Sequence, residues 1–227
     1  MAWQSGLPLW LSGGIPSVRP AGRCLGLQLW LKRLLIDIPL SAMALIVLSP
    51  LLIGLAVAIR LTSKGPALFR QPRVGLGGSD FMMLKFRTMR IEACDATGLA
   101  QVVADDDRVT PVGRFLRATS LDELPQLWNV LVGDMAIVGP RPMVRGQCAA
   151  GVEYRKAVPY YDYRHRVRPG LSGWAQANGL RGPTTEIKSA KDRIDHDCAY
   201  VQNFSLALDV RIIILTIARE FLTGSGV

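Results

Sequence analysis

The longest uncharged stretch of the chain predicts a helix embedded in a membrane. Residues 38–59 read IPLSAMALIVLSPLLIGLAVAI, 22 positions without a charged side chain. A helix needs roughly 20 apolar residues to cross a hydrocarbon core of about 30 Å, so the length permits one crossing. A signal peptide fits poorly, because the run is long, begins late and is followed by no small-residue cleavage site. A buried helix of a soluble core is the alternative, although such helices usually carry some polar residues.

Ser49 and Pro50 stand in the middle of this stretch and predict a bend. Proline has no N–H, and its ring clashes with the carbonyl four residues back, that of Ile46. In lipid this carbonyl needs a partner, and the Ser49 hydroxyl can bond back to the preceding turn. Basic residues stand at both ends of the stretch: Lys32 and Arg33 before it, Arg60 and Lys64 after it. Since basic flanks favour the cytoplasmic side, we favour a re-entrant helix over a kinked helix that spans the bilayer.

The remaining chain predicts an α+β fold that is mostly helical. Two strand-like runs within residues 66–89 flank the turn-rich LGGS and predict a β-hairpin, in which Pro72 restricts the first run to an edge strand or bulge. Residues 113–132 predict one helix, because four apolar residues fall on one face. These are Leu124, Leu127, Trp128 and Leu131. Residues 139–142, GPRP, predict a rigid turn.

The two ends of the chain are less informative. Residues 205–222 are apolar on most sides and fit either a core helix or an amphipathic helix in the membrane interface. Residues 1–29 contain no motif and remain an unassigned N-terminal extension. We therefore expect three parts: this extension, a membrane helix over residues 30–64, and a cytoplasmic domain over residues 65–227.

Composition narrows the class of protein. Hydrophobic residues make up 49% of the 227 positions, and 27 Lys and Arg face 18 Asp and Glu, a net charge of +9. This hydrophobicity excludes intrinsic disorder. Four dispersed cysteines and two histidines argue against a disulfide framework or a structural zinc site. An apolar, basic chain suggests an anionic lipid surface as its partner before it suggests nucleic acid.

The strongest candidate for chemistry is the acidic pair Asp122 and Glu123. Ser120 and Glu123 have the spacing of a capping box, so a purely structural role at a helix start is a serious alternative. A helix start also favours an ionised carboxylate, however, and such a carboxylate can attack phosphorus or hold Mg²⁺. The acidic run at residues 105–107 is more typical of a solvated turn than of a metal site.

Basic residues supply three candidate phosphate sites. Arg141 lies between two prolines, and its guanidinium suits bidentate phosphate binding. Residues 164–168, RHRVR, would place alternating basic side chains on one face of an extended segment, among them Arg166 and Arg168. Lys85 and Arg87 form a similar face. Each of these sites could equally be a solvated surface or a structural turn. Arg193 and Asp197, four residues apart, are expected to form an ion pair on a helix surface.

Taken together, the motifs resemble the bacterial sugar transferases, the monotopic phosphoglycosyl transferases that start glycan assembly on a polyprenol carrier. The matching runs cover residues 30–227 and include LKFRTMR, SLDELPQLWNVLVGDMAIVGPRP, YRHRVRPGLSGWAQANG and YVQNFSLALDVRIIILT. The resemblance implies a Mg²⁺-dependent transfer of sugar 1-phosphate from a UDP-sugar to polyprenol phosphate, with release of UMP. It also implies a re-entrant helix at the cytoplasmic face of the bacterial inner membrane, and exopolysaccharide or glycan synthesis as the pathway.

The same resemblance implies roles for individual residues. Asp122 would be the nucleophile of a covalent aspartyl intermediate and a Mg²⁺ ligand, Glu123 would assist it, and Arg141 would hold a substrate phosphate. The Leu-Arg-Gly at residues 180–182 resembles members that use UDP-hexoses. Two other readings stay open: an inactive membrane scaffold of the same fold, and a membrane-anchored nucleic-acid-binding protein, for which no readout module is present. The sequence also leaves open a homodimer.

Overall fold

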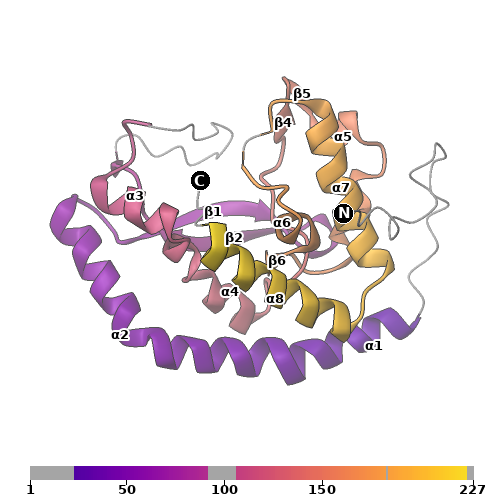
Figure 1. Cartoon of the computed structure of the whole chain (residues 1–227), viewed down its shortest axis with the longest axis horizontal. Coiled ribbons are helices and arrows are strands. Elements are labelled where there is room, and N and C mark those ends of the chain that lie inside the picture. The colour runs from indigo at the N-terminus through magenta and orange to yellow at the C-terminus, as the bar shows by residue number, and fades with distance from the viewer. Residues whose placement is uncertain (1–22, 92–105, 183, 224–227) are drawn as a thin grey trace.

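The computed structural model describes residues 23–91, 106–182 and 184–223 (Figure 1). Helix α1 (Arg23–Lys32), one π-helical turn (Arg33–Asp37) and α2 (Ile38–Thr62) follow one another without a break and lie along one side of the molecule. Within the described residues, this is the one helix that is long and apolar enough to cross a membrane. Only 6% of its most apolar 18-residue stretch is buried against the protein, so it is not the core helix of a soluble domain.

Helix α2 continues through Pro50 and changes direction along its length (Figure 1). The Ser49 hydroxyl donates to the Ile46 carbonyl at 2.7 Å. This is the carbonyl that Pro50 leaves without its helical partner. The hydrogen bond predicted from the Ser-Pro pair is therefore confirmed.

Both ends of this long helix are attached to the same domain. At the N-terminal end, the buried Lys32 ammonium lies 2.8 Å from Asp209 and donates to the Val138 carbonyl at 2.7 Å. At the C-terminal end, the Arg87 guanidinium donates to backbone carbonyls that follow α2, those of Ser63, Lys64 and Pro66, at 2.6–3.0 Å. Polar contacts thus fix the helix to the domain on both sides of its apolar middle.

The predicted β-hairpin is confirmed. Strands β1 (Leu68–Val74) and β2 (Asp80–Phe86) are antiparallel, with Leu68 opposite Phe86 and Val74 opposite Asp80. A tight turn, η3 (Leu76–Gly78), connects them. Pro72 is exposed in this two-stranded sheet, as expected for an edge strand.

The single helix predicted over residues 113–132 is wrong. The chain instead forms α3 (Pro111–Ala118), the 3₁₀ turn η5 (Leu121–Glu123) and α4 (Gln126–Val132). The break occurs because Ser120 has a left-handed backbone, with φ 54°. Pro125 adds to it, because it has no N–H to bond to the carbonyl four residues back, and α4 begins only after it. The predicted apolar face is only partly correct, since Trp128 is exposed whereas Val130 is completely buried.

Short elements complete the domain. Strand β3 (Ala136–Val138) pairs in parallel with β6 (Gly170–Ser172), and β4 (Cys148–Ala149) pairs with β5 (Val152–Glu153). The helical elements of this half are α5 (Tyr154–Ala157), η6 (Tyr161–Arg166), α6 (Trp174–Ala177), α7 (Ile187–Gln202) and α8 (Leu206–Thr223). After β3 the chain bends at residues 139–140 and is irregular at residues 141–142, so the turn expected over residues 139–142 is present only as this bend. There a side chain on Gly139 would approach the Arg168 carbonyl to 2.4 Å, so glycine is required.

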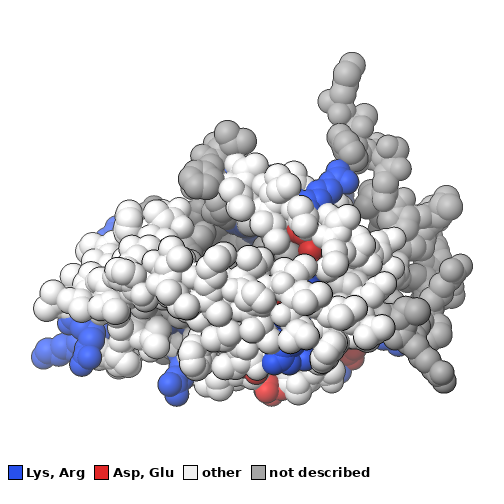
Figure 2. Space-filling model, turned by 90° about the horizontal axis from the view of Figure 1, so that it is seen from below, with Lys and Arg blue, Asp and Glu red and all other residues white. Residues whose placement is uncertain are grey.

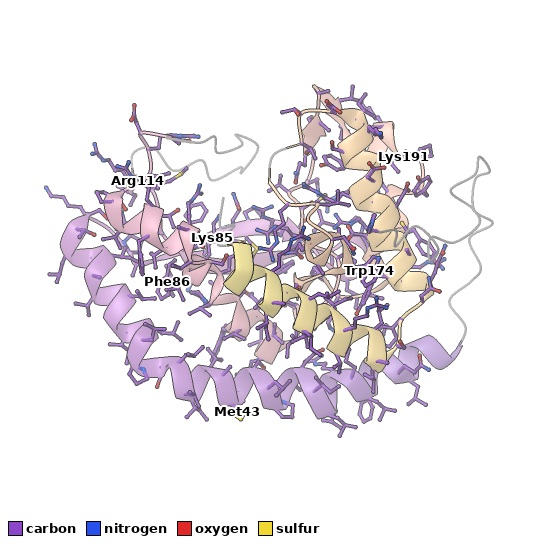
Figure 3. The ribbon with its side chains drawn as sticks, in the orientation of Figure 1. Met43, Lys85, Phe86, Arg114, Trp174 and Lys191 are labelled. Atoms are coloured by element: carbon purple, nitrogen blue, oxygen red, sulfur yellow. The ribbon has the colours of Figure 1, made fainter. Side chains whose placement is uncertain are left out.

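One face of the molecule is strongly apolar. Helix α8 buries Asp209 and Ile212 against the domain but exposes Val210 and Ile214, as in an amphipathic interfacial helix. Helix α2 exposes Leu40, Met43, Ile46, Val47, Leu51, Ile53, Val57 and Leu61. Figure 2 shows this side as a largely uncharged surface with basic side chains mainly toward its margins, and Figure 3 shows Met43 projecting away from the domain. The fold is therefore mostly helical, with small sheets, and compatible with a monotopic membrane protein.

Candidate active site

Asp122 and Glu123 lie in η5, between α3 and α4, and not at the start of a regular helix. The predicted capping box is wrong, because the Ser120 side chain makes no cap bond and the Glu123 carboxylate binds Arg141 instead. Leu121, directly before the pair, packs in the cluster formed by Ile59 and Leu116. The acidic pair is thus one residue from the contact between α2 and the domain.

Arg141 forms a two-pronged ion pair with Glu123. Its Nη1 donates to one carboxylate oxygen at 3.2 Å, and its Nη2 contacts the other. Burial alone would raise the pKa of the Glu123 carboxyl, but the charge and hydrogen bonds of Arg141 outweigh this and hold that pKa below its usual range. The Arg141 side chain remains 42% exposed, so its outer edge can meet an anionic ligand.

Cationic side chains surround the two carboxylates. Lys85 comes from β2, where its neighbour Phe86 points the other way, into the cluster that packs against α2 (Figure 3). The further cations that influence the pair electrostatically are Arg73 of β1, Arg117 of α3, Arg141 and Arg181. Five cations therefore act electrostatically on one or both carboxylates, an excess of three positive charges that favours a polyanionic ligand such as a diphosphate.

Two groups of this site have pKa values near neutrality. Burial raises the pKa of the Asp122 carboxyl to about 6, and the negative charge of Glu123 adds to the shift. Burial lowers the pKa of the Lys85 ammonium to about 8, and the nearby charge of Arg73 adds to it. Such values are typical of groups that react or bind ions, although structural networks produce them too.

The Asp122 side chain is available for chemistry. The residue is only 8% exposed. In the described part of the chain no hydrogen bond or ion pair to its carboxylate is present, unlike that of Glu123. A buried, unpaired carboxylate costs stability, so its retention at this position favours a functional role. It can attack an electrophilic phosphorus or serve as a metal ligand.

A metal would have few protein ligands here. No group of three or more His, Cys, Asp or Glu side chains with metal-binding geometry occurs among the described residues. Mg²⁺ commonly binds to one or two carboxylates and completes its shell with water and substrate phosphates. Asp122, with Glu123 beside it, fits such a shared site.

Three predicted substrate-binding residues are not brought into this site. The Arg87 guanidinium donates its hydrogen bonds to the backbone carbonyls after α2. Arg168 donates to the Gly133 carbonyl at 2.8 Å, and Arg166 lies exposed, 4.8 Å from the ring centre of Tyr163. The structure joins Lys85 and Arg141 to Asp122 and Glu123, but places Arg87 at a structural contact.

The expectation of a basic, extended strip over residues 164–168 is wrong. Residues Tyr161–Arg166 form the 3₁₀ helix η6, and Arg164 is buried. Its ion-pair partner is Asp197, so the expected surface pair between Arg193 and Asp197 is also wrong. The acidic residues near position 106 match the solvated-turn reading only in part: Asp106 pairs with Arg108, whereas residue 105 lies outside the described residues.

Sequence reasoning missed Arg73, Arg117 and Arg181. Arg73 had a usable signal, because the hairpin register puts residues 69, 71 and 73 on the same face as residues 81, 83 and 85. That face carries Lys85, so a predicted register would have placed both cations together. Arg117 reaches the site from helix α3 and Arg181 from an irregular loop, and no local sequence pattern marks either residue.

A cationic, carboxylate-bearing site beside an apolar helix is typical of membrane-associated enzymes that handle phosphorylated substrates. The chain belongs to the bacterial sugar transferase family, whose model matches residues 27–223.

Named relatives support this assignment. The chain is 48% identical over 200 residues to the exopolysaccharide production protein PSS of Rhizobium leguminosarum bv. phaseoli, covering 88% of this chain and 100% of that protein. It is 48% identical over 180 residues to the UDP-glucose:undecaprenyl-phosphate glucose-1-phosphate transferase of Xanthomonas campestris pv. campestris, covering 79% of this chain and 37% of the relative. It is 45% identical over 191 residues to a UDP-N-acetylgalactosamine-undecaprenyl-phosphate N-acetylgalactosaminephosphotransferase of Aeromonas hydrophila, covering 84% and 43%. The chain thus spans less than half of the last two.

Proposed function

We propose that this protein transfers a sugar 1-phosphate from a UDP-sugar to polyprenol phosphate, releases UMP, and so starts exopolysaccharide or glycan synthesis. The observation that carries the proposal is the acidic pair of η5, set among five cations and directly after Leu121, which packs against the apolar helix α2. Relatives with this named activity support it. The donor is a UDP-hexose. The relatives named as UDP-glucose transferases support this donor, and the relative named for UDP-N-acetylgalactosamine supplies the alternative.

The reaction proceeds in two displacements. A carboxylate oxygen of Asp122 attacks the β-phosphorus of the donor, and the bond from that phosphorus to the oxygen bridging the two phosphates breaks, so that UMP leaves. An oxygen of polyprenol phosphate then attacks the same phosphorus and displaces Asp122, which gives polyprenyl-diphosphate-sugar. Two steps let one nucleophile serve two bulky anions in turn. Glu123 assists by orienting Arg141 through their two-pronged ion pair.

The cations make the attack possible, because a diphosphate repels a carboxylate. Lys85, Arg141 and Arg73 neutralise charge on the donor and hold its phosphates in line with Asp122. Mg²⁺ held by Asp122 and the substrate phosphates would add further neutralisation, the usual contribution of this ion to phosphoryl transfer. The residues present fit such a shared ion.

The apolar helix is re-entrant in this proposal, and the domain lies at the cytoplasmic face of the inner membrane. Lys32 and Arg87 attach the two ends of the helix to one polar domain. A helix that crossed the bilayer would have to separate these ends by about 30 Å of hydrocarbon. The bonded Ile46 carbonyl further allows the bend at Pro50 to lie in lipid without an unsatisfied acceptor.

Release of UMP tests the function. Purified protein in nanodiscs with Mg²⁺ is given UDP-glucose, UDP-galactose or UDP-N-acetylgalactosamine, with and without polyprenol phosphate. We expect acceptor-dependent turnover with one donor, no turnover in Asp122→Asn, and wild-type turnover in the control Asp162→Asn, an exposed carboxylate paired with Arg155. An Asp122→Asn variant as active as wild type would favour the inactive scaffold, in which the pair is structural.

Cysteine labelling tests the topology. Single cysteines near residues 30 and 62, in a variant lacking the native cysteines, are exposed to a membrane-impermeant reagent in oriented vesicles. Equal accessibility from the cytoplasmic side is expected. Labelling of the two positions from opposite sides would contradict the re-entrant helix and leave the enzymatic proposal untouched.

A further inference from the structure

The loop that carries Arg141 is held mainly through its carbonyl oxygens. Pro140 and Pro142 have no N–H, so this loop cannot be fixed by a regular ladder of backbone bonds. The Pro140 carbonyl accepts the first N–H of β6 at 3.0 Å. The Arg141 carbonyl accepts from the Arg164 guanidinium at 2.6 Å, and the Pro142 carbonyl accepts from Arg73 at 3.3 Å. Arginine side chains thus supply two of these three bonds to the loop of Arg141.

Arg164 is itself fixed by an acid on α7. Its Nη2 lies 2.7 Å from the Asp197 carboxylate, and both side chains are 1% exposed. The same nitrogen donates to the Arg141 carbonyl. One guanidinium nitrogen therefore connects α7 to the backbone of Arg141. A buried ion pair often contributes no more stability than apolar packing, so stability alone does not explain it.

A second side chain of α7 holds another part of the site. Arg193 lies one helical turn before Asp197, is buried, and donates from Nη2 to the Gly182 carbonyl at 2.9 Å. Gly182 directly follows Arg181, one of the cations that act on Glu123. The buried polar face of α7 is therefore linked to two loops that approach the same carboxylate from different parts of the chain.

We propose that Arg164, Arg193 and Asp197, here called the α7 clamp, position Arg141 and Arg181 around Glu123. The proposal rests on the proposed function, because Arg141 is there assigned to the donor phosphates. The three residues do not reach the substrate themselves; they act through the loops of residues 139–142 and 180–182. The clamp is a positioning device for the cationic half of the site.

The first test compares two buried acids of the same helix. Asp197→Asn breaks the link to Arg164, whereas Asp195→Asn alters a buried carboxylate whose bonded partner is the Tyr160 hydroxyl. We expect Asp197→Asn to lower kcat/KM for the UDP-sugar by about tenfold to a hundredfold, the range expected for a misplaced catalytic contact. Asp195→Asn should stay near wild type. Equal activity of the two variants would overturn the proposal.

A double-mutant cycle distinguishes positioning from general destabilisation. In an Arg141→Ala background, Asp197→Asn should cause little further loss, because the group that it positions is already missing. Losses that multiply would mean that Asp197 acts through overall stability, and would overturn the proposal. If Asp197→Asn fails to fold because Arg164 is left as an unpaired buried charge, the pair Arg164→Met with Asp197→Leu removes both charges. This folded variant should show the same loss, and wild-type activity in it would refute the clamp.

Hydrogen exchange provides a readout that does not depend on catalysis. In Asp197→Asn, peptides that cover residues 139–147 should exchange faster than in wild type, and in Asp195→Asn they should not. Unchanged exchange in Asp197→Asn would overturn the clamp even if the enzyme is active. If the wild-type protein releases no UMP but the two variants still differ in exchange in this way, the proposed function is refuted and the clamp is supported.

Discussion

Asp122 and Lys85 together predict a bell-shaped pH dependence for the first displacement. Burial, reinforced by Glu123, raises the pKa of Asp122 to about 6, and burial, reinforced by Arg73, lowers that of Lys85 to about 8. Asp122 must be ionised to attack phosphorus, so activity rises as the pH passes through 6. Lys85 must be protonated to hold the donor phosphates, so activity falls as the pH passes through 8. The maximum lies near pH 7.

The magnitudes follow from the two ionisations. At pH 5 about one tenth of Asp122 carries a charge, so kcat/KM should be about tenfold below its plateau. At pH 9 about one tenth of Lys85 remains charged, and a similar loss is expected. Because kcat/KM reports groups of the free enzyme, these values apply before the donor or a metal changes them.

The assay must exclude the acceptor, because a phosphate monoester has its own second pKa near 6. UMP released in a single turnover without polyprenol phosphate reports the first displacement alone, and the donor diphosphate has no group that titrates in this range. Lys85→Arg is the matched variant, since arginine keeps the charge at every accessible pH. Its alkaline limb should disappear while the acidic limb stays near 6. An alkaline limb that persists near pH 8 would refute the role of Lys85, and a flat wild-type profile down to pH 5 would refute that of Asp122.

Four further variants test separate parts of the structure. The pKa of Asp122 in the folded protein lies above its ordinary value of 3.8, so ionisation of Asp122 destabilises the fold as the pH rises from about 4 through 6. Asp122→Asn should therefore raise the free energy of unfolding by about 3 kcal/mol at pH 8, seen as a higher Tm. At pH 4 the same variant should have little effect. Arg87→Lys should lower the Tm without changing KM for the UDP-sugar, because one ammonium cannot replace a guanidinium that bonds several carbonyls. Arg73→Ala, in contrast, should raise that KM. The opposite pattern would show that Arg87 binds the substrate. Ser49→Ala removes the partner of the Ile46 carbonyl and should cost about 1–3 kcal/mol in lipid, measured by thermal melting in nanodiscs, and an unchanged melt would show that the bend does not depend on this bond.

Local rules predicted the parts of the fold that are local in origin. The hairpin depends on strand alternation around LGGS, and the Ser49 bond depends on neighbours within one turn. The break at Ser120 was not predicted, because the spacing of apolar residues permits a helix through residues 113–132. The left-handed backbone of Ser120 does not change that spacing. The pairing of Arg164 with Asp197 escaped for another reason: 33 positions separate them, so only the packing of α7 reveals which arginine is buried.

The same distinction explains why the site was only half visible in the sequence. Asp122 and Glu123 are adjacent and therefore conspicuous, but the cations around them come from β1, β2, α3 and two loops. The position of the acidic pair has a physical cause: Leu121, directly before it, packs with Ile59 and Leu116 and so fixes the pair beside the C-terminal part of the apolar helix. Packing of apolar residues thus sets the position of the carboxylates relative to the apolar helix α2. The excess of positive charge around the pair then favours an anionic ligand at this position beside the apolar helix.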